Sequence, residues 1–429
     1  MYIGPLIAAA AFARTRWLAR RLRTRAHIAA YQDRRIRALL ADAARNLPYY
    51  QALGHRPLAA LPQMDKAALL ADFAALNRPG LSVEAVRAVL AAGEERVAGH
   101  VVGQSTGTSG NRGYYVVTEA ERYVWLGTLL AKALPDALWR RHRVALALPG
   151  LSRLYRAASS GSRIALAFYD LAQGVDAWAE ALAAFDPDTI VAPPKVLRRL
   201  AETGGLRARH VFSGAEVLDP LDREIIEAST GQRVREIYMA TEGLFGVSCP
   251  HGTLHLAEDV VHFEWQQPDP ASCLRTPVVT DFTRRAQAML RYRMNDLLQL
   301  APAPCACGSP LQAVARIEGR QDDAFWLQSA GGALRMVTPD VLRNAVVDAS
   351  PAIRDFRVVQ TGPDTIAVRL DPALPAAVDA CVVASLRSRL APFGVDALRI
   401  EVARGLDLPF DRKLRRVRRA WTPPPQSQS

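Results

Sequence analysis

The segment from Ser105 to Gly113 is the most distinctive part of this 429-residue chain for its chemistry. It reads Ser105-Thr106-Gly107-Thr108-Ser109-Gly110-Asn111-Arg112-Gly113, with three glycines and four hydroxyl side chains in nine residues. Such a loop offers many N–H and O–H donors, which is how many proteins hold phosphate groups. It is not a Walker A loop, because no Gly-Lys-Ser/Thr follows at the required spacing. A polar surface loop has the same composition, so the segment alone leaves both interpretations open.

Four further motifs follow this loop and combine acidic, basic, hydroxyl and aromatic side chains. They are Phe212-Ser213-Gly214-Ala215-Glu216, Tyr238-Met239-Ala240-Thr241-Glu242, Tyr292-Arg293-Met294-Asn295-Asp296 and Gly319-Arg320-Gln321-Asp322-Asp323. Each motif has an ordinary structural explanation when taken alone, for example a core aromatic residue or a turn aspartate. Short motifs are hypotheses that need context, so their fixed order carries more information than any single one.

A second group of residues has the chemistry of a metal site. Cys249 and His255 stand close together, and Cys305-Ala306-Cys307-Gly308 follows about fifty residues later. Three thiolates and one imidazole form a closed tetrahedral set, which suits a structural Zn²⁺ with no position left for water. His251 is a competing ligand, and buried cysteines are often inert. The sequence predicts a structural zinc site at Cys249, His255, Cys305 and Cys307.

Short apolar runs alternate with helical stretches in the middle of the chain and predict the elements that position these motifs. The runs are Val144–Leu148, Ile164–Tyr169, Thr189–Ala192, His210–Phe212 and Val234–Tyr238, with helices expected near 175–185, 194–203 and 219–229. This alternation predicts an α/β fold, with mostly parallel sheets covered by helices. Ligands of such sheets usually bind outside the carboxyl ends of the strands.

The two ends of the chain have different patterns. Residues 14–47 predict one helix that ends at Pro48, and a second helix is expected after the N-cap residue Asp65. From about residue 322 the pattern predicts a small α+β domain: a helix opening at Thr338–Pro339, a hairpin over 354–369, a helix near 375–391 and a strand at 398–403. We therefore expect a large domain at 1–321 and a small domain at 322–429.

Composition limits the class of protein. Half of the residues are apolar and 22% are charged, which excludes a disordered or fibrous chain. The net charge of +12 is compatible with a nucleic-acid partner, but the aromatic residues are not interleaved with the basic ones. Only four basic residues are lysines, namely Lys66, Lys132, Lys195 and Lys413. Five cysteines make no disulfide framework, and no stretch reaches the length of a membrane span, so we expect a cytoplasmic protein.

The ordered motifs resemble those of the adenylate-forming superfamily, specifically its phenylacetate–coenzyme A ligase-like branch. That family has a Ser/Thr/Gly loop, a Gly-Ala-Glu element, Tyr-Gly-x-Thr-Glu, Tyr-Arg-x-x-Asp, Gly-Arg-x-Asp-Asp and a late lysine, in this order. The resemblance extends from about residue 47 to residue 419. Asn111 stands where the family usually has lysine, Met239 replaces a glycine, and no glycine precedes Lys413. Some members of the branch also have a zinc site of this Cys/His and Cys-x-Cys form.

The resemblance implies a role for each motif residue. Ser105, Thr106, Gly107, Thr108, Ser109 and Gly110 would hold the β- and γ-phosphates of ATP. Tyr238 would stack on adenine, with Gly214, Ala215 and Glu216 on its other side. Thr241 would donate to the α-phosphate, Glu242 would hold Mg²⁺, Asp296 would bind the ribose hydroxyls, and Arg320 would add a cation. Asp322 would be a hinge, and Lys413 would stabilise the transition state of adenylation.

The predicted function is ATP-dependent activation of a carboxylic acid to an acyl-adenylate, with release of pyrophosphate and transfer to a thiol. The thiol would belong to coenzyme A or to the phosphopantetheine arm of a carrier protein, and the branch favours aromatic acids. Tyr123, Trp125, Tyr155 and Phe168 are candidates for the acid pocket. Two alternatives stay open: a non-catalytic nucleotide-binding relative that acts as a partner module, and a zinc-containing nucleic-acid-binding protein.

Overall fold

The computed structural model describes residues 3–105, 113–148, 163–269, 272–395, 397–406 and 413–423. Its contacts divide the chain into two compact units. The first comprises 1–266, 275–294 and 300–316, and the second comprises 267–274, 295–299 and 317–429. The second unit thus contains the expected small domain together with three neighbouring segments.

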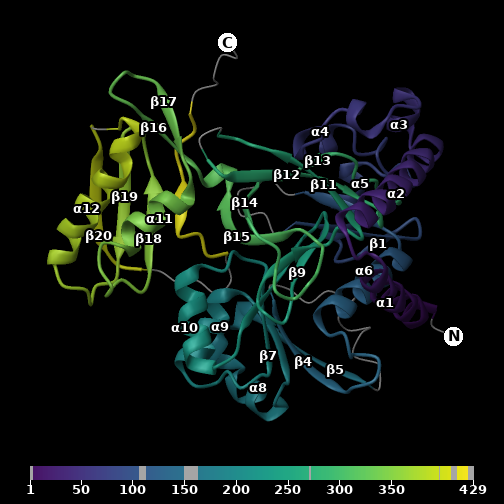
Figure 1. Cartoon of the computed structure of the whole chain (residues 1–429), viewed down its shortest axis with the longest axis horizontal. Helices are drawn as coiled ribbons and strands as arrows, with labels where there is room; N and C mark the ends of the chain where they lie inside the picture. Colours follow the sequence, from purple (N-terminus) through teal and green to yellow (C-terminus); the bar gives the residue numbers. More distant parts are fainter. Residues whose placement is uncertain are drawn as a thin grey trace. The chain divides into compact units, whose positions relative to one another are not determined.

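The first unit begins with helices and a small three-stranded sheet (Figure 1). Its elements up to the central sheet are α1 (Ile3–Arg21), α2 (Arg25–Asn46), α3 (Pro48–Leu53), α4 (Lys66–Ala71), α5 (Val83–Ala91), β1 (Arg96–Val97), β2 (His100–Gln104), β3 (Tyr114–Val117) and α6 (Glu119–Ala133). Asp65 caps α4 as expected, by accepting a hydrogen bond from the backbone N–H of Ala68. α6 begins with a capping box between Thr118 and Glu121.

The prediction of a single helix over residues 14–47 is wrong. The helix begins earlier, at Ile3, and is interrupted between Arg21 and Arg25. Thr24 has extended backbone angles, and its hydroxyl accepts a hydrogen bond from the N–H of His27, so it caps a new helix. The apolar and arginine pattern continues through the interruption, and a single N-cap threonine is easily hidden in such a pattern.

The centre of the first unit is a sheet with a parallel half. Its elements are β4 (His142–Leu148), β5 (Ile164–Asp170), α8 (Ala179–Phe185), β6 (Thr189–Ala192), α9 (Pro194–Glu202), β7 (His210–Gly214), α10 (Pro220–Thr230) and β8 (Val234–Ala240). The strands lie in the order β5-β4-β6-β7-β8, and each neighbouring pair is parallel. All five expected strands are present, because doubly covered parallel strands are continuous apolar runs. The predicted α/β fold class is confirmed.

Antiparallel strands extend this sheet beyond β8. They include β9 (Gly243–Ser248), β10 (Leu254–Leu256), β11 (Val261–Gln266), β12 (Leu274–Asp281), β13 (Tyr292–Arg293) and β15 (Ala313–Arg320). β8, β9, β10 and β15 pair in that order, and β12 pairs with β11 and β13. A cluster of buried side chains joins α1 and α6 to β4, β7, β8 and β9. No helix in the described residues is both long and apolar enough to cross a bilayer.

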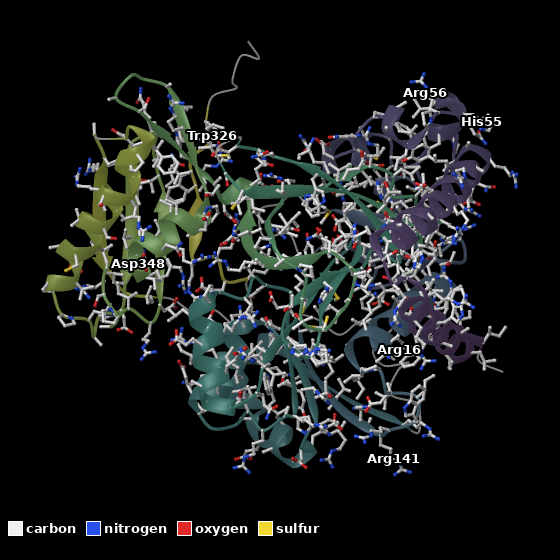
Figure 2. The ribbon with its side chains drawn as sticks, in the orientation of Figure 1. Arg16, His55, Arg56, Arg141, Trp326 and Asp348 are labelled. Atoms are coloured by element: carbon white, nitrogen blue, oxygen red, sulfur yellow. The ribbon has the colours of Figure 1, made fainter. Side chains whose placement is uncertain are left out.

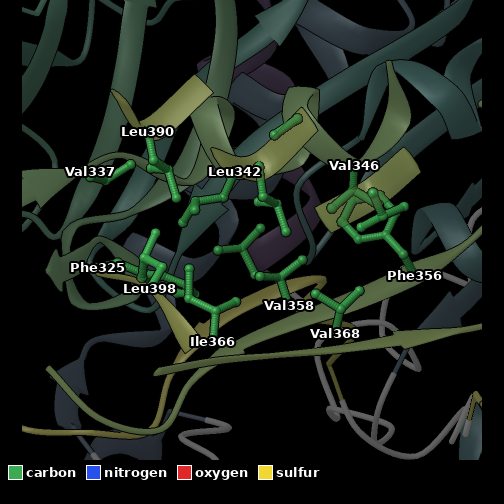
Figure 3. Packing of buried hydrophobic residues seen from close by; sticks show 14 of the residues in the cluster. Phe325, Val337, Leu342, Val346, Phe356, Val358, Ile366, Val368, Leu390 and Leu398 are labelled. Carbon is green, nitrogen blue, oxygen red and sulfur yellow. The ribbon is translucent and has the colours of Figure 1, made fainter. Parts of the chain in front are cut away.

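The second unit has the predicted order of elements. After β14 (Asp296–Leu300) and the end of β15 come β16 (Phe325–Gln328), β17 (Leu334–Val337), α11 (Pro339–Val347), β18 (Phe356–Gln360), β19 (Thr365–Leu370), α12 (Ala377–Leu390), β20 (Arg399–Arg404) and β21 (Val417–Arg419). A four-stranded sheet in the order β20-β19-β18-β21 packs with α11 and α12 around an apolar core (Figure 3). Phe325, Leu342, Phe356 and Ile366 are completely buried in it.

Candidate active site

Two of the sequence motifs lie side by side at one edge of the parallel sheet. β7 ends at Gly214, and β8 ends at Ala240. Because the two strands are parallel neighbours, their carboxyl ends face the same edge. Ala215 has a φ of 67°, a left-handed angle that is uncommon for a residue with a side chain. The fold therefore brings Gly214–Glu216 beside Tyr238–Glu242, at the edge where ligands of such sheets bind.

Tyr238 lies in the last part of β8 and is mostly buried, with 7% of its surface exposed. Its ring centroid is 5.2 Å from that of Phe245, which belongs to the neighbouring strand β9. The pairing of β8 with β9 shifts its register between Tyr238 and Met239. Such an irregularity re-aims the side chains that follow it. Met239, which replaces a glycine of the family's motif, thus lies where the strand leaves regular pairing.

The carboxylate of Glu242 is held from two sides by hydroxyl groups. The hydroxyl of Thr241 donates to Oε2 at 2.9 Å, and the hydroxyl of Tyr292 donates to Oε1 at 3.3 Å. The guanidinium of Arg284 donates to the carbonyl oxygen of Thr241 at 2.8 Å, which fixes the backbone of this turn. The arrangement holds a half-buried carboxylate in one orientation, with oxygen ligands of the kind that Mg²⁺ prefers.

Gly243 follows the turn and approaches β12 too closely for a side chain. A Cβ atom at this position would lie 2.6 Å from Oδ2 of Asp281. Complete burial raises the pKa of the Asp281 carboxyl, although hydrogen bonds from Thr283 act against this shift. The close approach explains why a glycine directly follows Thr241–Glu242.

The predicted phosphate loop connects two strands of a hairpin. β2 and β3 are antiparallel, and the backbone N–H of Ser105 donates to the carbonyl oxygen of Gly113 at 2.7 Å. In return, the N–H of Gly113 donates to the Ser105 hydroxyl at 2.8 Å. The remaining predicted phosphate ligands lie outside the described residues, namely Thr106, Gly107, Thr108, Ser109 and Gly110. The structure therefore defines the base of this loop.

The second unit contains Asp296 and Arg320, which the structure brings together. Nε of Arg320 lies 3.8 Å from Oδ1 of Asp296, on neighbouring segments of the unit. Next to them, the backbone N–H of Gln321 donates to the carbonyl oxygen of Asn295 at 2.7 Å, and the amide of Asn295 contacts the Asp322 carboxylate. The two motifs that end in Asp296 and begin at Gly319 therefore form one continuous polar cluster.

The predicted hinge is tied to the segment that carries Lys413. The guanidinium of Arg415 forms an ion pair with the carboxylate of Asp323, with an Nε to Oδ2 distance of 3.2 Å. Nε of Arg419 donates to the carbonyl oxygen of Asp322, also at 3.2 Å. Lys413 itself is half-buried. Within the second unit, Lys413 therefore lies on a segment that is fastened to the hinge residues.

The four predicted zinc ligands meet at one point of the first unit. Cys249 follows β9, His255 lies in β10, and Cys305 and Cys307 lie in the connection before β15. Their ligand atoms all lie within 4.8 Å of one another. The Sγ atoms of Cys249 and Cys305 are 3.8 Å apart, too far for a disulfide. Two thiolates at ordinary Zn–S distances on a tetrahedral ion would be separated by about the same distance. His251, the competing candidate, does not belong to this cluster.

The surroundings of the cluster suit a metal ion. Nδ1 of His255 lies 3.1 Å from the carbonyl oxygen of Leu311, which leaves Nε2 facing Sγ of Cys307 at 3.3 Å. A carbonyl partner of this kind fixes the histidine tautomer at many zinc sites. Burial raises the pKa of Cys305, but hydrogen bonds from Cys307, Thr253 and His255 outweigh it and lower the pKa to about 6. The thiolate, which is the form that binds metals, is thus favoured at neutral pH.

Three of the four candidates for the acid pocket lie in the apolar core or pack against it. Tyr123 is buried in α6, and Trp125 and Phe168 pack against the buried cluster that joins α1 and α6 to the sheet. Tyr155 lies outside the described residues. The structure thus gives these described aromatics a packing role, as their ordinary interpretation predicted.

All four lysines are buried or half-buried, in contrast to the many exposed arginines. A Cβ atom on Gly113 would lie 3.5 Å from Cε of Lys66, so this lysine lies at the base of the loop. Nζ of Lys132 is 2.7 Å from Oδ1 of Asp259, and Lys195 forms a buried ion pair. Sequence reasoning did not single out Lys66, at the base of the loop, or Lys195, the partner of Glu216, and their rarity in an arginine-rich chain was the available signal.

Comparisons with known proteins define the fold. No family model matches the chain, and no curated protein matches it in sequence. A solved structure of 2-hydroxyisobutyryl-CoA ligase in the postadenylation state with 2-HIB-AMP is similar, with a TM-score of 0.66, 20% identity, and coverage of 89% of this chain and 87% of that one. The structure of the anthranilate CoA ligase AuaEII with anthranoyl-AMP is similar as well, with a TM-score of 0.51 and 14% identity over 73% of this chain and 65% of that one.

The amide bond synthetase McbA from Marinactinospora thermotolerans is also similar, with a TM-score of 0.54 and 15% identity over 73% of this chain and 68% of that one. All three similarities lie below 25% identity and therefore show the fold alone: this chain has the fold seen in these two CoA ligases and this amide bond synthetase.

Proposed function

We propose that this chain activates a carboxylic acid with ATP and transfers the acyl group to a thiol. In the first step, the carboxylate oxygen bonds to the α-phosphorus and the bond to pyrophosphate breaks, which yields an acyl-adenylate. In the second step, the thiol sulfur bonds to the acyl carbon and AMP leaves. The observation that carries the proposal is the meeting of Gly214–Glu216 and Tyr238–Glu242 at one strand edge, in a fold shared with ligases that hold acyl-adenylates.

Each nucleotide group would have a partner of suitable chemistry. Tyr238 would offer a ring to adenine, Asp296 would accept hydrogen bonds from the ribose, and Arg320 would supply a nearby cation. Thr241 would donate to the α-phosphate, and loop 105–110 would hold the other phosphates. Glu242, with its carboxylate held by Thr241 and Tyr292, would bind Mg²⁺, which would neutralise charge on the phosphates. Lys66, at the base of the loop, would supply an ammonium to the phosphates.

Lys413 would serve the adenylation step. An ammonium is a compact point charge, and negative charge crowds where a carboxylate attacks a phosphate. Its segment is fastened to Asp322 and Asp323, so a rotation at these residues would move Lys413 with it. We propose that residues 322–429 rotate in this way between the two half-reactions.

An aromatic acid is the proposed substrate, on the basis of the branch that the motifs resemble. The similar ligases hold an aliphatic acyl-adenylate in one case and an aromatic one in another, so the fold is compatible with both. The acceptor would be coenzyme A, which one structure of 2-hydroxyisobutyryl-CoA ligase contains, or the phosphopantetheine arm of a carrier protein. The four-ligand cluster would hold a structural zinc ion. The described cysteines form no disulfide, which fits the reducing cytoplasm.

Acid-dependent exchange of labelled pyrophosphate into ATP tests the proposal most directly. We expect exchange with some members of a panel of aryl and aliphatic acids, and none without acid. Binding of ATP without exchange for any acid would identify a non-catalytic relative. Binding to DNA that weakens steeply with salt, without ATP turnover, would favour the nucleic-acid alternative instead.

A further inference from the structure

Exposed apolar side chains gather at one place in the first unit. Six large hydrophobic side chains are strongly exposed among the described residues, and five of them belong to α1 or to the segment after α6: Ile3, Leu6, Trp17, Leu138 and Trp139. The two tryptophans have exposed fractions of 54% and 63%. Scattered apolar residues on a surface need no explanation, whereas a gathered group indicates an interaction surface.

The exposed residues of α1 form a continuous stripe along one side of the helix. Spacings of three and four residues place them on the same face, and all five are exposed: Ile3, Leu6, Ala10, Ala13 and Trp17. The other side of α1 is already packed, since Phe12 and Leu18 are buried. A Cβ atom on Gly127 of α6 would lie 2.1 Å from the carbonyl oxygen of Ala8, so the two helices are in close contact. Among the described residues, the stripe therefore remains uncovered.

The charge around this stripe is entirely positive on α1. The helix has four arginines and no acidic residue: Arg14, Arg16, Arg20 and Arg21. The guanidinium carbon of Arg21 lies 5.3 Å from the ring centroid of Trp17. Beside the helix, a hollow of about 360 Å³ is lined by apolar side chains of α1 and α2 together with Arg21 and Arg34. Apolar side chains and arginine guanidinium groups thus lie close together beside α1.

The segment after α6 repeats this combination. The Trp139 ring packs edge-on against Phe12 of α1, with centroids 6.1 Å apart. Arg140 and Arg141 follow it and are exposed, and Nη1 of Arg163 donates to the carbonyl oxygen of Trp139. Figure 2 labels Arg16 of α1 and, below it in this view, Arg141 of the segment after α6. Trp139 lies on the Phe12 side of α1, so the surface proposed below, which we call the α1 surface, is the exposed stripe of α1 with its arginines.

Charge decides between two occupants of the α1 surface. A second copy of this chain would add a surface with the same arginines and no acidic residue on α1 to pair with them. An anionic lipid surface would instead pair them with phosphates, while tryptophan and leucine side chains enter the interfacial layer. We propose that the α1 surface binds the chain peripherally to bilayers that contain anionic phospholipids. This function would be additional to acid activation and does not depend on it.

Co-sedimentation of the full chain with vesicles tests this proposal. We expect binding to vesicles of phosphatidylcholine mixed with phosphatidylglycerol, and little binding to phosphatidylcholine alone. Raising the salt concentration from about 0.1 M to about 0.5 M should weaken binding, because exposed charges are screened. The double substitution Leu6→Glu/Trp17→Glu should lower the bound fraction about tenfold or more, because two charges would have to enter the apolar layer.

Two alanines of α1 provide a matched control for the apolar stripe. Ala10 and Ala19 are both exposed, but nine residues separate them, so they point to opposite sides of the helix. Ala10→Glu and Ala19→Glu change the net charge equally, and only Ala10→Glu should strongly reduce binding. Equal loss in the two variants, with unchanged melting temperatures, would overturn insertion of the stripe. Absence of binding to anionic vesicles, or a dimer that Leu6→Glu dissociates, would overturn the proposal as a whole.

Discussion

Lys195 and Glu216 form an ion pair inside the first unit, with Nζ 3.2 Å from Oε1 and only 4% of each side chain exposed. Lys195 follows the carboxyl end of β6, and Glu216 follows the carboxyl end of β7. The pair therefore connects two neighbouring strand ends at the edge where the nucleotide is proposed to bind. It also fastens Glu216 directly after Ala215, the residue with a left-handed backbone.

Removing one partner of this pair should destabilise the protein strongly. Lys195→Met leaves the Glu216 carboxylate buried without its cation, and we expect the free energy of unfolding to fall by about 3–5 kcal/mol. Glu216→Gln should lower the free energy of unfolding by a similar amount. The double variant Lys195→Met/Glu216→Gln should recover a large part of it, because neither charge remains. Urea unfolding of the four proteins measures the coupling, and simple additivity of the two losses would contradict it.

Lys413→Ala should reduce acyl-adenylate formation by about 10²-fold or more, the scale for losing one preorganised electrostatic group. Thiol transfer from a supplied acyl-adenylate should be affected much less. Lys413→Arg should be nearly as impaired as Lys413→Ala, because a planar guanidinium does not replace a compact ammonium. Arg418→Ala, a change at an exposed arginine of the same segment, is the control. Adenylation at the wild-type rate in Lys413→Arg would refute the assigned role.

Elemental analysis should find one zinc ion per chain at the four-ligand cluster. Cys305→Ser should lose the metal and lower the melting temperature, while adenylation by the folded fraction persists, since the site has a closed ligand set. Cys381→Ser removes an exposed cysteine of α12 and should change neither property. Purified wild-type protein without zinc would rule out this site.

Asp355 should make the second unit sensitive to acid. Burial acts to raise the pKa of its carboxyl, but Arg416 and Arg357, each within 2.9 Å, outweigh it and hold the pKa below its usual value. A lowered folded pKa stabilises the fold above the unfolded pKa, and this stabilisation disappears as pH falls through the folded pKa. Asp355→Asn should therefore cost about 2 kcal/mol at neutral pH. The difference from wild type should shrink below about pH 4, as denaturant unfolding at several pH values would show. A constant difference across this range would contradict the assignment.

Asp322→Pro tests the proposed hinge. Proline fixes φ and removes the N–H that lies 3.3 Å from Oδ1 of Asn295. One half-reaction should therefore be impaired more than the other, which separate assays of adenylation and thiol transfer would reveal. Asp322→Ala keeps both the N–H and the backbone freedom, so it reports the loss of the carboxylate alone. Equal loss in both half-reactions, with folding intact, would argue against a hinge at this residue.

The sequence was most informative for elements whose own structure requires a recognisable pattern of residue types. The run Val144–Leu148 predicted a buried strand because a doubly covered strand needs apolar residues at every position. The grouping of Cys249, His255, Cys305 and Cys307 was predictable because few residue types bind zinc. The pairing of Lys195 with Glu216 was not, since the register of β6 and β7 brings them together across twenty residues of chain. The contact between Asp296 and Arg320 likewise depends on strand ends that meet only in the folded chain.

The placement of the lysines has a practical consequence for chemical labelling. None of the four lysine side chains is exposed, and at least two of them hold carboxylates as partners. Reagents that acylate amines would find few reactive side chains on the folded protein, although its surface is strongly cationic. Mass spectrometry could then follow the reactivity of Lys413 against a very low background, with and without nucleotide. Lys413, the residue proposed for adenylation, would thus be one of only four lysine amines that such a reagent could modify.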